Sequence, residues 1–150
     1  MGQEMKWLRA HVRECLQEVW EVCRVEVDAD GDVPFRTGST AGWVTAVEGN
    51  PPLVRVWAHV AFGVKATAAV LRELNDINRR SRSAHVYWSD QCVIAEQTLH
   101  ADGVDTETLR QAWVAVSAVA NDLGPMLVAV HGGSTPFAAE GSSVDDRETG

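Results

Sequence analysis

Hydrophobic residues recur at steps of three and four in three stretches of the chain, which is the spacing that lines one side of an amphipathic helix. In residues 4–23 the positions on this side are Leu8, Val12, Cys15, Val19 and Val22. In residues 66–80 they are Val70, Leu71, Leu74 and Ile77. In the third stretch, which has Asp105 or Thr106 as its amino cap, they are Leu109, Ala112, Val116, Val119 and Leu123. These patterns predict three helices.

The ends of two of these helices are predicted from residues that break helical spacing. An acidic, turn-rich stretch begins at Val25 and predicts that the first helix ends near Arg24. Gly124-Pro125 predicts a stop or a kink in the third helix, because proline lacks the N–H that a helix interior needs. The apolar residues 126–130 are then expected to form another turn or two of helix.

Between the predicted helices the period changes to two, as in β-strands with one buried face. Three such segments lie within residues 33–62 (VPFRT, WVTAVE and LVRVWAHVAF), and two more are residues 84–88 and 92–99. In the third segment one side carries Val54, Val56, Ala58, Val60 and Phe62. The other side is mixed, which predicts an antiparallel sheet with one covered face and one face open to solvent or to a partner.

The predicted fold is an α+β sandwich in which an antiparallel sheet of about five strands packs against helices. A chain of 150 residues with 45% hydrophobic residues is long enough for one core without a metal or a disulfide. We place this domain at residues 1–133. Residues 134–150 have a single aromatic residue, Phe137, and no periodicity, so they are expected to form a disordered acidic tail.

The charge of the chain excludes several classes of partner. The net charge of −8 comes from 21 acidic and 13 basic residues, with no local basic cluster, which argues against nucleic acid and anionic membranes. The amino terminus has no apolar signal region, and the longest nearly apolar run, residues 112–120, is far short of the ~20 residues that cross a bilayer. A soluble cytoplasmic protein is expected, and its three cysteines are expected to be reduced, buried thiols.

Several short segments resemble one protein family in a fixed order along the chain. They are LRELNDIN (71–78), HVYW (85–88) and VIAEQTL (93–99), preceded by GDVPFRTG (31–38) and PLVRVW (52–57). This ordered set is similar to the YbjN family, which is grouped with the type III secretion chaperones. The element order helix-strand-strand-strand-helix-strand-strand-helix is also that of the type III secretion chaperone fold.

The resemblance implies an α/β sandwich that dimerises and holds an extended segment of a client protein, without catalysis or ATP. It supplies no defined ligand residues. The expected function is therefore a non-catalytic chaperone-like or adaptor protein, a homodimer that shields an apolar client segment. The alternatives are a regulatory or sensory module that binds a partner or small ligand, and a small hydrolase; a deep closed pocket with convergent polar groups would favour either of these.

Tryptophan is the most informative residue type for a binding surface, because large aromatic side chains dominate contact energies at interfaces. Trp57 lies between Arg55 and His59 on the mixed side of its strand, and Trp43 shares that side if the hairpin register allows it. Trp7 lies off the apolar side of the first helix. These five residues are predicted to bind the partner; the other interpretation is that a second helix layer or a dimer partner covers them.

Other polar residues are predicted to be structural, and no metal or cofactor site is expected. Asn75 and Asn78 lie beside the apolar side of their helix, where the amides need hydrogen-bond partners on a neighbouring backbone or at the helix end. Residues 28–32 (DADGD) suggest calcium, but their spacing does not match an EF-hand loop, so an acidic turn is predicted. His11 and Cys15 are one helical turn apart, yet no second pair completes a zinc site.

The sequence also lacks the short motifs of common enzymes. It has no Gly-x-Ser-x-Gly elbow, no phosphate-binding glycine loop and no Ser-x-x-Lys pair. No catalytic residue is predicted.

Overall fold

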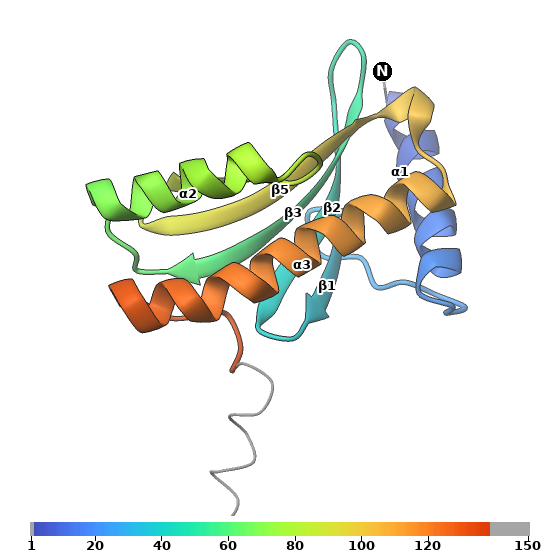
Figure 1. Ribbon diagram of the computed structural model, residues 1–150. Helices are drawn as coiled ribbons and strands as arrows, with labels where there is room; N and C mark the ends of the chain where they lie inside the picture. Colours follow the sequence, from blue (N-terminus) through green and yellow to red (C-terminus); the bar gives the residue numbers. More distant parts are fainter. Residues whose placement is uncertain (1, 139–150) are drawn as a thin grey trace, which may run out of the picture.

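The computed structural model describes residues 2–138, which form three α-helices and one five-stranded antiparallel sheet (Figure 1). The elements in chain order are α1 (Gly2–Val19), β1 (Val33–Thr37), β2 (Thr40–Val47), β3 (Leu53–Phe62), α2 (Ala68–Arg80), β4 (His85–Ser89), β5 (Cys92–His100), the 3-10 helix η1 (Ala101–Gly103) and α3 (Thr106–His131). The strands are ordered β1-β2-β3-β5-β4 across the sheet. The predicted α+β fold and element order are confirmed.

The core lies between one face of the sheet and the helices. On β3, Val54 and Val56 are fully buried, and on α3 the same is true of Leu109, Val116 and Leu127. Figure 1 shows α2 and α3 running across the sheet, with α1 at one end. Each such aliphatic side chain contributes roughly 1.5–3 kcal/mol through removal from water. This face of the sheet is called the covered face below.

The first helix ends at Val19, earlier than the predicted end near Arg24. Glu21 adopts a left-handed backbone conformation with φ of 53°, and the N–H of Val22 donates to the carbonyl of Gln17 at 3.0 Å. This is a Schellman ending, which normally has glycine at the left-handed position. Because Glu occupies this position, no glycine marks the end of the helix, and Val22 is 42% exposed instead of buried.

The three cysteines are all free, but they differ in exposure. Cys15 is buried in the core, whereas Cys92 is partly exposed and Cys23 is exposed beyond the end of α1. The prediction of buried thiols is therefore right for Cys15 and wrong for Cys23, whose position follows from the early end of the helix.

The third helix begins as predicted. Asp105 is its amino cap and accepts a hydrogen bond from the N–H of Thr108 at 2.8 Å, while the Thr108 hydroxyl accepts one from the N–H of Asp105 at 2.9 Å. This reciprocal pair is a capping box, which satisfies two backbone donors that a helix start leaves free.

The third helix does not stop at Gly124-Pro125 but continues to His131. Gly124 is buried so close to β3 that a Cβ atom there would lie 2.7 Å from the carbonyl oxygen of Val60. Leu127, one turn further on, is fully buried. Of the predicted stop or kink, the stop is wrong, because tertiary packing beyond the proline maintains the helix. The further helical turns predicted for residues 126–130 are present.

Helix α3 is also the one described helix that is long and apolar enough to cross a membrane. Its buried residues nevertheless lie against β3 and β5, with Leu109 and Val116 fully inside the domain. One side of α3 thus packs in the core, while by length and composition the whole helix meets the requirement for a span, contrary to the expectation from the short apolar run at residues 112–120.

A β-bulge changes the alternation at the end of β3. The register with β5 shifts between His59 and Ala61, so that Val60 and Ala61 are both buried. Phe62 is therefore turned away from the core and is only partly buried, contrary to its predicted core position. Leu71 was also expected in the core, but it is 47% exposed because α2 fully buries only one narrow side.

The chain beyond α3 remains in contact with the sheet. Ser134 pairs with Phe62 through two backbone hydrogen bonds of 2.7 and 2.9 Å, and the N–H of Phe137 donates to the carbonyl of Ser39 at 3.2 Å. The Arg36 guanidinium lies 3.7 Å from the ring centre of Phe137. The first residues of the predicted tail, Ser134 to Phe137, therefore contact the domain, and residues 139–150 lie outside the described residues.

Candidate functional site

The face of the sheet opposite the covered face carries most of the predicted partner-binding residues, and we call it the open face. The strand register places one row of side chains across all five strands. The row consists of Pro34, Trp43, Trp57, Glu96 and His85. Side chains that are direct cross-strand partners point to the same face of the sheet, and along one strand every second residue does so. Residues two positions from this row therefore lie on the same face.

Two tryptophans form the centre of the open face. Trp43 and Trp57 are direct cross-strand partners whose rings stack with centroids 4.8 Å apart and planes inclined by 27°. The His59 ring meets both edge-on, at 5.4 and 5.5 Å. All three side chains are partly exposed. Such aromatic pairs contribute about 0.5–1.5 kcal/mol beyond their buried area. The aromatic platform formed by Trp43, Trp57 and His59 is therefore ordered before a partner binds.

The polar edge of Trp57 is also fixed. Its indole N–H donates to the hydroxyl of Thr45 on the neighbouring strand at 3.0 Å. With the ring stacked on Trp43 and its N–H paired, Trp57 has one defined orientation. A partner on this face would meet a preformed aromatic surface, which lowers the entropic cost of binding.

Arg55 lies on the same face and is held by a carboxylate and a phenol. Its Nε is 2.6 Å from Glu96 Oε1, and a terminal nitrogen is 3.2 Å from Oε2 of the same carboxylate. The same guanidinium donates to the Tyr87 hydroxyl at 2.8 Å, and that hydroxyl donates to Glu96 at 2.8 Å. The sequence analysis identified Arg55 but neither Glu96 nor Tyr87.

The pKa shifts of this network agree with its geometry. Burial alone would raise the pKa of Glu96, but hydrogen bonds from Arg55 and Tyr87 outweigh it and lower that pKa. Burial, followed by the hydrogen bond to Glu96, raises the pKa of Tyr87. Burial opposes the charge of Arg55, yet the bond to Glu96 leaves its pKa raised. The pair is therefore ionised and internally neutralised at neutral pH.

In contrast to Arg55 and Glu96, His59 favours its uncharged form. Burial, and then the positive charge of Arg55, lowers the pKa of its imidazole. Its Nδ1 atom is buried and has no hydrogen-bond partner among the described residues. The neutral ring is thus the favoured form, in keeping with its edge-on aromatic contacts.

Trp7, the fifth predicted contact, is not brought to this cluster. It lies on α1, is 61% exposed and stacks on His11 with centroids 5.2 Å apart. The Nε2 atom of His11 is 2.7 Å from the carbonyl oxygen of Val104, and Cys15 is 3.8 Å from the same nitrogen. His11 thus serves a contact between α1 and the segment before α3.

The two asparagines of α2 differ in their contacts. Asn78 donates to the carbonyl of Val86 at 2.9 Å and accepts from the N–H of the same residue at 2.8 Å. These bonds tie α2 to the outer strand β4. Asn75 is exposed, and its side chain makes no hydrogen bond within the described part of the chain.

The acidic turn brings three carboxylates together, with ligand atoms of Asp28, Asp30 and Asp32 within 4.8 Å of one another. One oxygen of Asp28 already accepts the backbone N–H groups of Asp30 and Asp32, at 3.0 and 2.9 Å. Burial raises the pKa of Asp32 and repulsion from the other two acids adds to this, while a hydrogen bond from Thr45 lowers it; the net pKa is raised. These contacts describe an acidic turn held by its own side chain.

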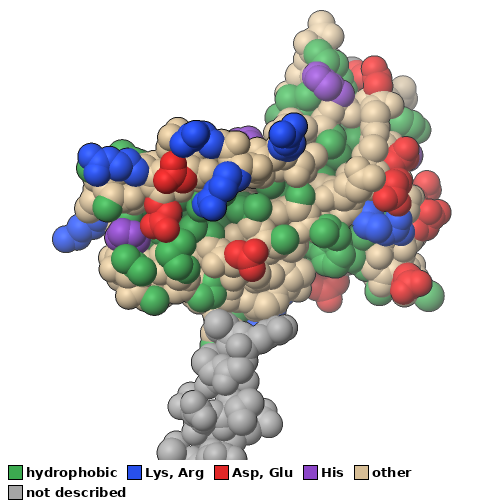
Figure 2. Space-filling view, viewed as in Figure 1, with side chains coloured by type: hydrophobic (Ala, Val, Ile, Leu, Met, Phe, Trp, Pro, Cys, Tyr) green, Lys and Arg blue, Asp and Glu red, His purple; other side chains and the backbone are tan. Residues whose placement is uncertain are grey.

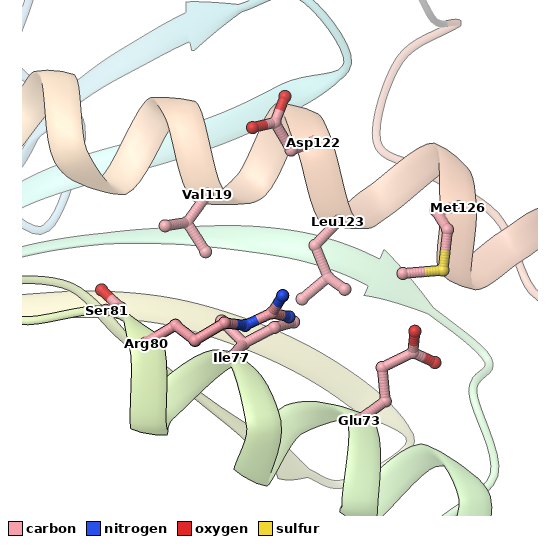
Figure 3. A pocket seen from close by; sticks show the side chains of 8 residues that line it. All are labelled: Glu73, Ile77, Arg80, Ser81, Val119, Asp122, Leu123 and Met126. Carbon is pink, nitrogen blue, oxygen red and sulfur yellow. The ribbon is translucent and has the colours of Figure 1, made fainter.

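The helix side carries a shallow groove of about 450 Å³ between α2 and α3. Figure 3 shows Ile77 of α2 opposite Val119 and Leu123 of α3, with Glu73 and Arg80 on the α2 side. In Figure 2, basic side chains gather around this region, over α2. Apolar side chains of both helices line the groove together with the polar residues Glu73, Arg80, Ser81 and Asp122.

The remaining tryptophans separate into other environments. Trp20 and Trp113 contact each other at 5.9 Å and both contact Phe35, at 6.3 and 6.4 Å. Trp88 donates its indole N–H to the carbonyl of Val64 at 2.7 Å. None of the six indoles is completely buried, so the expectation that not all of them are core residues holds.

Comparison with known proteins gives one family and several similar folds. A family model described as "T3SS (YopN, CesT) and YbjN peptide-binding chaperone 1" matches residues 6–139. No curated protein matches the chain at a significant level.

Two solved structures have a similar fold at low sequence identity. The chain in the "Crystal Structure of the ExsC-ExsE Complex" is 12% identical, with a TM-score of 0.63 over 82% of this chain and 95% of that one. The chain in the "Structure of the HopA1-SchA Chaperone-Effector Complex" is 7% identical, with a TM-score of 0.64 over 80% of this chain and 94% of that one. At these identities the likeness concerns the fold.

Proposed function

This chain belongs to the T3SS and YbjN family of peptide-binding chaperones, and we propose that its open face is the surface that binds the client peptide. The observation that carries the proposal is the stacked Trp43–Trp57 pair, which remains partly exposed on the face that α2 and α3 do not cover. Arg55 and His59 complete the site as its immediate neighbours.

The mechanism supported by this surface is passive binding. An extended client segment that lies on the open face removes apolar surface from water, at about 25 cal/mol per Å², and loses conformational entropy as it is ordered. Nothing in this process requires bond chemistry or a cofactor. We therefore propose a non-enzymatic protein that shields an apolar segment of a client protein until the client folds or is transferred to another protein.

Three further properties belong to this proposal. The net charge of −8 supports a soluble protein, and the cytoplasm is the compartment that we propose for it. The family resemblance supports a homodimer, which sedimentation equilibrium would detect as twice the chain mass of 16.3 kDa. Exposure of 61% supports Trp7 as a second, separate contact for a long client.

A synthetic peptide provides a direct test. The neutral probe is a peptide of about twelve residues with capped termini and an uncharged coumarin label, in which Ile and Phe alternate with Ser and Thr, the pattern of an extended segment with one apolar side. We expect Trp43→Ala and Trp57→Ala each to weaken its binding about tenfold or more, since central aromatic residues dominate interface energies.

The control is Val114→Ala on α3, which removes an exposed apolar side chain from the helix layer. It should leave binding of the neutral probe unchanged. Urea unfolding of each variant checks that the domain remains folded. Unchanged binding in both tryptophan variants, with a folded domain, would remove the open face from the proposed site.

A further inference from the structure

The guanidinium of Arg55 has two neighbours that determine what it is able to do. It lies over the ring of Trp57, with Cζ 4.3 Å from the ring centroid, and it is paired with Glu96 through two nitrogens. The side chain of Arg55 is 26% exposed and that of Glu96 is 14% exposed. The positive charge of Arg55 is therefore neutralised by Glu96 within the protein, at a site that is only partly exposed to solvent.

The pairing also fixes the plane of the guanidinium. Two parallel N–H···O bonds to one carboxylate and a third to the Tyr87 hydroxyl leave it little rotational freedom. A planar cation fixed in this way forms a wall for an aromatic ring. Trp57 thus has Arg55 over its ring, Trp43 stacked at 4.8 Å and Thr45 on its N–H.

We propose that Arg55 is a positioning residue for Trp57, and that Glu96 and Tyr87 hold it in that role. The centre of the open face is then an aromatic platform without net charge, and it selects client segments that are apolar and uncharged over segments that are acidic. This inference rests on the proposed function for the client, while the positioning of Trp57 is measurable without any client.

The first experiment observes Trp57 directly. The full chain is labelled with 5-fluorotryptophan, which gives one fluorine resonance for each of the six tryptophans, and the Trp57 resonance is assigned with Trp57→Phe. We expect Arg55→Gln and Glu96→Gln to shift and broaden this resonance. The resonances of Trp20 and Trp113 should stay in place, which shows that the helix side is intact.

Two variants sharpen this result. Arg55→Lys keeps the positive charge opposite Glu96 but lacks the planar group, so the Trp57 resonance should not return to its wild-type position. Arg36→Gln is the matched control, because this arginine lies against Phe137 instead of Trp57. A Trp57 resonance that is unchanged in Arg55→Gln, or restored in Arg55→Lys, overturns the positioning role.

The second experiment measures selectivity with two probes. The acidic probe is the neutral probe with two Thr replaced by Asp. We expect the wild-type chain to prefer the neutral probe, with an affinity that changes little between about 50 and 500 mM salt, because no open charge pair is formed. Arg55→Gln should weaken binding of the neutral probe about tenfold through the loss of Trp57 order.

Opposite outcomes identify the failing part. Tighter binding of the acidic probe, or a loss in Arg55→Gln confined to that probe, shows that Arg55 binds client carboxylates and overturns the inference. Failure of the wild-type chain to bind either probe contradicts the proposed function and with it the stated selectivity. The fluorine spectra then decide the positioning role independently.

Discussion

The two faces of the sheet differ although they are built from alternate residues of the same strands. On β3, Val56 is fully buried among aliphatic side chains, while the next residue, Trp57, is partly exposed among aromatic and charged ones. The covered face is held by non-directional packing, whereas the open face is held by stacking and by hydrogen bonds with defined geometry. The comparison indicates that stability resides mainly in the covered face, while the open face is the surface for which we propose recognition.

The largest expected effect tests the covered face. Leu109→Ala removes a fully buried side chain of α3 and should lower the free energy of unfolding by about 2–5 kcal/mol, because a cavity remains. Urea denaturation measures this loss. Thr98→Ala, an exposed position on β5, should change stability by less than about 0.5 kcal/mol. Equal losses in the two variants would contradict the division between the faces.

The next effect tests whether polar contacts also hold the helix layer. Asn78→Ala removes both hydrogen bonds to the backbone of Val86 and should lower the free energy of unfolding by about 1–2 kcal/mol. Hydrogen exchange of the Val86 amide should accelerate in the same variant. Asn75→Ala, on the exposed side of α2, serves as the control and should change neither measurement.

The smallest expected effect is the pH dependence of stability that arises from His59 on the open face. Because the folded protein lowers the pKa of His59 below its ordinary value near 6.5, protonation favours the unfolded chain. Stability linked to His59 is thus complete above that value and is lost as the pH falls through the folded pKa. Thermal unfolding at pH 7.5 and 5.5 should show a smaller acid loss in His59→Gln than in the wild-type chain.

Glu96 titrates in a more acidic range and with its own sign. Its folded pKa is below the ordinary value of 4.5, so its contribution to stability is present above that value and is lost as the pH falls further. Glu96→Gln should therefore reduce the stability loss below pH 4.5 without changing the His59 range. An acid loss that is identical in wild type, His59→Gln and Glu96→Gln would contradict these assignments.

The sequence was sufficient to predict the secondary-structure elements and the residues that β3 contributes to the open face. Periodicity predicted the three α-helices and the five strands but not the 3-10 helix η1. Alternation on β3 placed Arg55, Trp57 and His59 together. The errors arose where local rules compete with tertiary structure. Glu21 adopts a conformation typical of glycine, and Pro125 is accepted within a helix that is packed on both sides of it.

Glu96 and Tyr87, which hold Arg55 in place, were not predictable from the same patterns. Glu96 and Tyr87 reach Arg55 because β5, and not β4, is the neighbour of β3. That pairing skips one strand along the chain, and single-strand alternation carries no information about it. A correct strand order would have identified Glu96, which lies directly opposite Trp57.

The path of the chain after α3 affects how this protein should be handled at the bench. Ser134 is paired with the end of β3, and Phe137 lies against Arg36, a residue whose register assigns it to the open face. An affinity tag or reporter fused to the carboxyl end would therefore be anchored a short distance from the surface under study. A fusion at the amino end would lie close to Trp7 on α1, so binding assays should compare a fusion at each end with the untagged chain.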